Sequence, residues 1–320
     1  MAQVVLGIGS SHGPSIQTMP DMWERLGVKD TRDPRFDYQE LLQSARPGLE
    51  REITLDVQRA RHTAAHAALG KLVDIITQAK LDLVVVISNI HRVRRDHAHP
   101  VFGVLRADSF EIEKRAIDAA DLDAKFTGAK RRAPEQTVPM PGGPSLANHL
   151  IESLIEDGFD VASVDRLPEG LPLDDAYTFI YDHLLGGAVM PMVPFFLSRD
   201  LPNQATPGRC YDLGTALRRT IESWPQNLRV GLIASGGLSH QIVDEELDRT
   251  VIDALVAGDA KAMRGLSRAQ LNRSPGTPEI LNWVTVAAAM APLQMKLIDY
   301  LPCYRSLAGT GHGVTFGYWK

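Results

Sequence analysis

Three histidines follow short β-rich runs of the sequence, and imidazoles at such places can bind metals or transfer protons. They are His12 after residues 4–8, His91 after residues 83–87, and His240 after residues 228–234. In an open α/β sheet the carboxyl ends of the strands form the edge where ligands bind. Burying three imidazoles without a function would be costly. We therefore expect these histidines to meet in one crevice.

A carboxylate joins this set. The string Ser274–Glu279 predicts the start of a helix, with Thr277 as the N-cap and Pro278 at the first helical position. Glu279 would then lie in the first turn, where the helix dipole favours its ionised form. It could simply cap the helix, or it could bind a metal. Two neutral imidazoles and one carboxylate, with coordination positions left open, suit non-haem Fe(II) that binds a substrate and O₂.

Composition excludes several classes of protein. The chain has 320 residues, 44% of them hydrophobic, and 34 Lys and Arg against 39 Asp and Glu give a net charge of -5. This balance is typical of a soluble globular protein and lacks the basic excess of a nucleic-acid-binding surface. Two cysteines fit a reducing compartment. We expect a cytoplasmic protein that binds neither membrane nor nucleic acid and forms a homo-oligomer, taken as a dimer.

The elements that would position these groups alternate between strands and helices. This order favours an α/β fold with a mixed central β-sheet flanked by helices, in a single domain that spans residues 1–320. Helical periodicity is expected in Glu50–Ala79, Ser145–Asp157 and Tyr211–Ser223, and in residues 243–256 and 278–291. Residues 20–80 could form a helical lid or insertion.

Three segments carry more specific expectations about strand pairing. Residues 101–105 and 110–115 look like a β-hairpin. Residues 188–197 predict a strand at the sheet edge or with bulges, because Pro191 and Pro194 cannot donate backbone hydrogen bonds. The glycine-rich tail, residues 306–317, is not assigned to a strand.

Four motifs recur in an order that resembles a known family. They are Gly9–His12, Asn89–His91, Gly236–Gln241 and Pro278–Glu279. Together they resemble the type III extradiol ring-cleavage dioxygenases, the superfamily of the protocatechuate 4,5-dioxygenase β subunit. Gly-Gly-Leu-Ser-His-Gln is the most specific of the four, and the likeness extends from residue 4 to the tail.

The resemblance implies a role for each site residue. His12, His91 and Glu279 would bind Fe(II), and His240 would be the acid/base histidine beside the substrate. Tyr304 and Arg305 would contact a substrate carboxylate, since an arginine can hold a carboxylate through two hydrogen bonds. The implied reaction opens the ring of a catechol-type substrate with O₂. Gallate, 3-O-methylgallate and protocatechuate are the natural substrates to expect, with a hydroxylated pyridine as a further option.

The sequence departs from the family pattern at two places. Ile90 stands before His91, where the β subunit has an aspartate. Residues 173–178, Leu-Asp-Asp-Ala-Tyr-Thr, stand where the β subunit has a segment with a further histidine near the substrate. Both the support of His91 and the orientation of the substrate could therefore differ from the family pattern.

Two other readings of the function remain open. The same ligands could serve a zinc-dependent hydrolase, or the chain could be a non-catalytic relative that binds a ligand. His62 and His66 lie four residues apart on a predicted helix, a spacing that can bind zinc. Because they fall on the apolar stripe, a buried, hydrogen-bonded role is favoured over metal binding. His312 has no assigned role.

Overall fold

The computed structural model describes residues 1–89, 100–114, 136–168 and 172–320. Its main feature is a mixed β-sheet with the strand order β10-β11-β1-β8-β2-β7-β3-β6, in which β9 pairs with β11. The strands of this sheet are β1 (Gln3–Ser10), β2 (Leu83–Ser88), β3 (Phe102–Leu105), β6 (Val161–Val164), β7 (Met192–Leu197), β8 (Arg229–Ser235), β9 (His240–Ile242), β10 (Lys296–Tyr304) and β11 (Thr310–Trp319). The predicted α/β fold with a mixed central sheet is confirmed.

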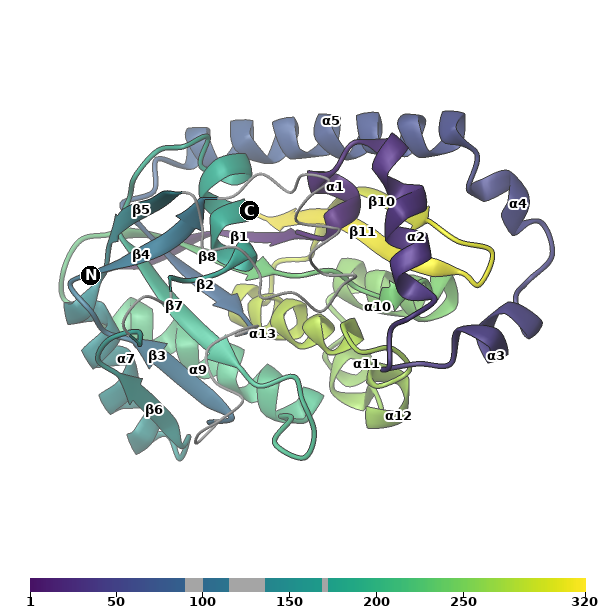
Figure 1. Cartoon of the computed structure of the whole chain (residues 1–320). Helices are drawn as coiled ribbons and strands as arrows, with labels where there is room; N and C mark the ends of the chain where they lie inside the picture. Colours follow the sequence, from purple (N-terminus) through teal and green to yellow (C-terminus); the bar gives the residue numbers. More distant parts are fainter. Residues whose placement is uncertain (90–99, 115–135, 169–171) are drawn as a thin grey trace.

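Helices cover both faces of the sheet (Figure 1). One face carries α1 (Pro14–Gln17), α2 (Trp23–Asp30), α5 (Leu55–Ala79), α8 (Asp175–Phe179) and the π-helix η2 (Ile180–Leu184). The other carries α7 (Pro144–Glu156), α9 (Pro207–Ser223), α10 (Glu245–Ala257), α11 (Ala260–Gly265) and α13 (Ile280–Met290). Each face buries its own apolar core, so the central strands are covered on both sides. This explains the unbroken aliphatic run of β2, all of which is buried.

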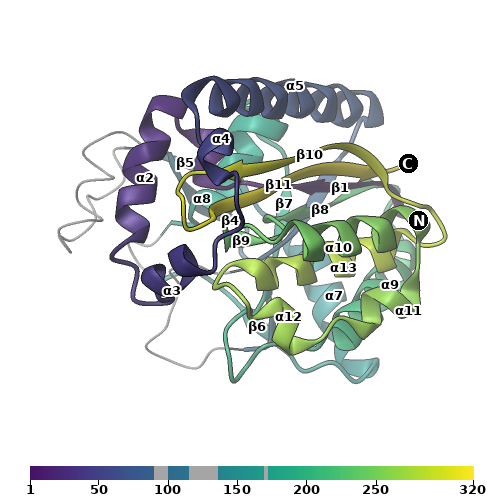
Figure 2. The same cartoon turned by 90° about the vertical axis from the view of Figure 1, so that its right-hand side faces the viewer.

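Shorter elements complete the chain. They are η1 (Pro20–Met22), α3 (Tyr38–Gln43), α4 (Leu49–Glu52), α12 (Arg268–Leu271) and η3 (Thr277–Glu279). Figure 2 shows α2, α3 and α4 beside the end where β10 and β11 are joined. There the Arg305 guanidinium forms two hydrogen bonds with the Asp30 carboxylate, of 2.6 and 2.9 Å. Residues 20–80 are thus largely helical, and α2 and α5 pack on the sheet; the role of the segment as a lid stays a prediction.

The parallel part of the sheet creates the edge where the predicted site lies. Strands β1, β8, β2 and β7 are neighbours that run in the same direction. Their carboxyl ends therefore meet at one edge, as the spacing of the histidines predicts. None of the described helices is long and apolar enough to cross a membrane.

The predicted hairpin is wrong. Phe102–Leu105 pairs with β6 and β7 in the large sheet, whereas β4 (Ser109–Lys114) pairs with β5 (Gln136–Pro141) in a separate two-stranded sheet. All of β3 is buried. Burial against distant strands therefore outweighs the short connection that favoured a local hairpin.

The proline-containing strand is not at the edge. β7 lies between β2 and β3, although it contains Pro194. Pro191 precedes the strand, and its carbonyl accepts a hydrogen bond from the Val84 amide. The register with β3 covers residues 195–197 and stops before Pro194, so the missing N–H breaks no pair there.

The glycine-rich tail is a central strand. β11 pairs with β1, β10 and β9, and nearly all of it is buried. A Cβ atom at Gly313 would lie 2.0 Å from Oδ2 of Asp248. The glycine therefore permits a close approach of α10 to the strand that carries His312.

Candidate active site

His12 lies just beyond β1 and is held in one tautomer. Its Nδ1 is 3.0 Å from Oγ of Ser235, and that hydroxyl donates to the carbonyl of Ala176 at 2.9 Å. Because the serine proton is used on Ala176, the imidazole must donate through Nδ1. The lone pair then lies on Nε2, the arrangement that a metal-binding histidine requires. The side chain is 4% exposed.

Glu279 is buried at the same edge, with its carboxylate held from two sides. Oε2 accepts from the Gly237 amide at 3.0 Å, and Oε1 accepts from Arg199 at 2.7 Å. Arg199 comes two residues after β7, so a third strand contributes to the site. Gly236 has a φ of 143°, and a Cβ there would lie 2.7 Å from Oε2. Glycine at this position is what lets the carboxylate approach the β8 loop.

The predicted N-cap is wrong. Gly276 is the N-cap of η3 and no side chain caps it. The Thr277 hydroxyl instead accepts from the His240 amide at 3.2 Å. The His240 carbonyl accepts from the Ser274 hydroxyl and the Gly276 amide. The segment before α13 therefore fixes the histidine loop rather than the helix end.

The His240 ring packs directly on Gly276. A Cβ at that glycine would lie 2.1 Å from Cδ2 of the ring, so no larger residue fits without displacing it. Burial lowers the pKa of His240 to about 3, which outweighs the opposite effect of the nearby Glu279. The imidazole is neutral at pH 7. Its Nδ1 is buried and has no hydrogen-bond partner among the described residues.

His312, to which the sequence assigned no role, lies in β11 and contacts the site. Its ring meets that of His240 edge to face, with centroids 4.3 Å apart, and its Nδ1 is 2.9 Å from Oγ of Ser15. The side chain is 2% exposed, and burial lowers its pKa well below the usual value. We refer to His12 and His312, which are both buried, together with the half-buried His240 as the buried histidine group.

The donors described so far fit the predicted iron. One imidazole presents a neutral nitrogen, and a buried carboxylate supplies negative charge, as hard-to-borderline Fe(II) prefers. The second predicted imidazole ligand, His91, lies outside the described residues. Within the described parts of the chain, no three His, Cys, Asp or Glu side chains form a metal-binding group. The full ligand set stays a prediction.

Tyr304 and Arg305 have partners within the chain. The Tyr304 hydroxyl donates to Glu245 at 2.7 Å, and the guanidinium of Arg46 lies 5.1 Å from the ring centroid. Arg305 is 7% exposed and pairs with Asp30 through Nε and one terminal nitrogen. Its charge lowers the pKa of both His240 and His312, which places it within electrostatic range of the site. Substrate contact by either residue stays a prediction.

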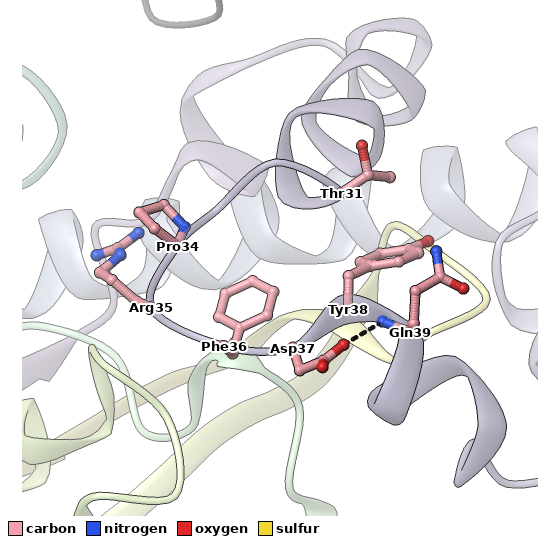
Figure 3. A pocket seen from close by; sticks show the side chains of 7 residues that line it. All are labelled: Thr31, Pro34, Arg35, Phe36, Asp37, Tyr38 and Gln39. Carbon is pink, nitrogen blue, oxygen red and sulfur yellow. Dashed lines mark hydrogen bonds between the residues drawn. The ribbon is translucent and has the colours of Figure 1, made fainter.

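A separate pocket lies in the segment that joins α2 to α3. It has a volume of about 490 Å³ and is lined by Thr31, Pro34, Arg35, Phe36, Asp37, Tyr38 and Gln39 (Figure 3). Asp37 caps α3 by accepting from the Gln39 amide. None of the predicted site residues lines this pocket, so it is not the predicted active site.

Comparison with known proteins identifies the family. Residues 55–314 match the family described as the catalytic LigB subunit of aromatic ring-opening dioxygenase. The chain belongs to the LigB family. Membership supports an aromatic ring-cleaving dioxygenase at the level of the family, and it confirms the resemblance seen in the sequence.

Two individual proteins are similar to this LigB-family chain. Gallate dioxygenase from Pseudomonas putida is 30% identical over 196 residues, which cover 55% of this chain and 54% of that protein. This chain thus spans about half the length of that relative. A crystal structure of the uncharacterized protein JW3007 from Escherichia coli K12 is 14% identical, with a TM-score of 0.49 over 98% of this chain and 99% of that one.

Sequence reasoning missed the residues that hold the site together. Ser235, Arg199 and Ala176 carry no motif of their own, and their contacts join residues 59 to 223 positions apart. A signal was available for one of them. Ala176 lies in the segment that departs from the family pattern, and the structure shows that this segment anchors the His12 hydrogen-bond chain.

Proposed function

We propose that this chain is a non-haem Fe(II)-dependent extradiol dioxygenase that opens the ring of a carboxylated catechol with O₂. The observation that carries the proposal is the His12–Ser235–Ala176 hydrogen-bond chain. It presents Nε2 of a buried imidazole as a ligand, at the same sheet edge as the buried Glu279 carboxylate.

His12, Glu279 and His91 would hold the iron. Bound Fe(II) would supply open coordination positions for two adjacent substrate oxygens and for O₂. Arg199 balances the charge of Glu279 and fixes its orientation through the 2.7 Å ion pair. Partners of this kind typically contribute about 10–100-fold to metal affinity or activity.

His240 is the residue that we assign to proton transfer. A neutral imidazole whose Nδ1 has no partner among the described residues can take a proton from a substrate hydroxyl and return it later. Gly276 and His312 hold the ring from two sides, which fixes its plane. Burial lowers the pKa of His240, so the ring is neutral before it takes the substrate proton.

Oxygen consumption tests the proposal. The protein is loaded with Fe(II) under anaerobic conditions and then assayed in air. It should consume O₂ when gallate, 3-O-methylgallate or protocatechuate is added. Absorbance and mass spectrometry should show a ring-opened product. The zinc-loaded protein should show neither. Hydrolysis without O₂ uptake would instead establish the zinc hydrolase, and neither activity on these or on dihydroxypyridines would contradict the proposal.

Arg305 is the residue that we propose for the substrate carboxylate, through the terminal nitrogen that Asp30 does not use. Removing Arg305 alone would leave Asp30 buried and unpaired, at a cost of about 3–5 kcal/mol. The double variant Asp30→Asn/Arg305→Gln removes both charges together, and it is compared with the unaltered chain. The double variant should raise KM for gallate and spare unsubstituted catechol. Equal effects on both substrates would remove Arg305 from carboxylate binding.

A further inference from the structure

Two histidines outside the candidate active site face each other on α5. His62 and His66 are one helical turn apart, and their Nε2 atoms are 3.2 Å apart. We refer to them as the helix-face histidine pair. A third donor comes from α1, where the carbonyl oxygen of Ile16 lies 3.1 Å from Nε2 of His66. That carbonyl also interacts with His62. Two imidazole nitrogens and one oxygen thus surround a single point.

Hydrogen bonds cannot satisfy all three atoms at once. A carbonyl oxygen can only accept, and one ring nitrogen of a neutral imidazole carries either a proton or a lone pair. If His66 donates to Ile16 through Nε2, the Nε2 lone pair of His62 competes for the same proton. A cation between the three atoms would be contacted by all of them at once.

The spacing fits a transition-metal ion. An ion placed about 2.1 Å from each nitrogen, the usual Zn–N distance, would subtend an N–metal–N angle of about 100° at this separation. That angle is close to both tetrahedral and octahedral geometry. Two histidines at positions i and i+4 of a helix are a recurrent zinc-binding arrangement.

The pair is also accessible. His66 is exposed and His62 is partly buried, so an ion and its waters can enter from solvent. Burial and the neighbouring imidazole lower the pKa of His62. At neutral pH a metal ion would therefore not have to compete with a second proton for the His62 ring. The sequence favoured a buried, hydrogen-bonded role for this pair; the structure shows the hydrogen bonds but leaves His66 exposed.

We propose that His62, His66 and the Ile16 carbonyl form a binding site for a late first-row divalent cation, Zn²⁺ above all, separate from the predicted iron site. Imidazole ligands select such ions over Mg²⁺ and Ca²⁺, which prefer oxygen. Water completes the coordination. No acidic or thiol ligand is needed, and the proposal does not depend on the proposed reaction.

Zinc titration in a chain that lacks His12 and Glu279, two of the three predicted iron ligands, tests the site. In a His12→Ala/Glu279→Ala background, calorimetry with Zn²⁺ should show binding at one equivalent. Adding His66→Gln should weaken that binding more than about tenfold, since even indirect partners of a metal contribute about 10–100-fold. His62→Gln should do the same. His149→Gln is the matched control, because this histidine lies on α7 with its Nε2 bonded to Ser223, and it should change nothing.

A second readout locates the ion and uses the unaltered protein. Crystals of the wild-type chain soaked in Zn²⁺ should show an anomalous peak between the two Nε2 atoms, and crystals of His66→Gln should lack it. Zinc binding that is equal in the background chain and in its His62→Gln and His66→Gln derivatives would overturn the proposal. So would an anomalous map with no peak at the pair.

Discussion

Two groups of histidines contact α1, one through Ser15 and the other through the Ile16 carbonyl, and they differ in what surrounds them. The rings of His240 and His312 are 4.3 Å apart, and those of the helix-face histidine pair are 4.4 Å apart. The contacts within each group are therefore alike. His312 is 2% exposed, however, whereas His66 lies at the surface. Burial, and not the distance between the rings, separates the two groups.

The difference shows that the surroundings of an imidazole decide whether it suits catalysis or ion binding. In the buried histidine group, Ser235 and Ser15 occupy ring nitrogens, and glycine leaves room for one ring position only. The proton of His12 is thus fixed, and the ring of His240 is held in place, before any ligand arrives, which favours catalysis. At the helix-face histidine pair, water can take the place of any partner. That pair, with His66 exposed, suits the binding of an ion from solvent.

The largest expected effect is on turnover and concerns His240. In His240→Phe the Fe(II) content should be unchanged while kcat falls about 10²–10⁴-fold, the usual contribution of a positioned acid/base group. The measurement is O₂ uptake together with iron analysis. His149→Gln should retain the wild-type rate. A His240→Phe protein with full activity would show that His240 does not transfer the proton.

Removing the Ser235 hydroxyl should weaken iron binding. Ser235→Ala leaves Nδ1 of His12 without its acceptor and the Ala176 carbonyl without its donor. Iron affinity should fall about 10–100-fold, as for other partners of metal-binding histidines. Chelator competition measures this. Ser223→Ala, which removes a serine 2.9 Å from His149, is the matched control. Equal affinities in the two variants would contradict the assigned tautomer.

Adding one methyl group beside His240 should also lower activity. In Gly276→Ala the new Cβ would lie 2.1 Å from the ring, so the imidazole must move. We expect kcat to fall about tenfold while iron stays bound, because even small misplacement of a catalytic group is felt strongly. Gly70→Ala on α5 has nothing within 4 Å of its Cβ and should leave activity unchanged. A normal rate in Gly276→Ala would show that the position of the ring is not critical.

The smallest effect is on the pH dependence of stability. Burial lowers the pKa of His312 in the folded chain, so between that pKa and about 6.5 the unfolded chain binds more protons. The free energy of unfolding should therefore fall as pH drops below 6.5. In metal-free His312→Gln this slope should weaken by at most about 1.4 kcal/mol per pH unit. Urea unfolding at pH 7 and pH 5 measures it.

Asp248, another buried group, changes the free energy of unfolding with pH in the opposite direction. It must therefore be the same in both proteins that are compared. Burial raises the pKa of Asp248 to about 6, so this carboxyl stabilises the fold as pH falls through that value. It is present in both proteins of the comparison and cancels. His62→Gln should change the slope less than His312→Gln, because water screens its more exposed ring. A larger change in His62→Gln would contradict the distinction between the two groups.

Much of the fold was predictable because it rests on local patterns. The aliphatic run of β2 and the apolar periodicity of α5, α9 and α13 identified these elements within a few residues of their observed bounds. The errors share a cause. The partners of β3, β7 and β11 are set by distant strands, and neither proline nor glycine content tells a central strand from an edge when the neighbouring register is unknown.

The sequence by itself determined the types of group at the site. Histidine after β1, histidine after β8 and Glu279 before an apolar helix name the chemistry and the family, because each lies in a short local motif. Only the tertiary structure decided what these groups do to one another. The tautomer of His12, the ion pair of Arg199 and the contact of His312 with His240 depend on atoms from strands far apart in the chain. Hydrogen bonds and burial act over a few ångströms in space, and a linear pattern does not contain those distances.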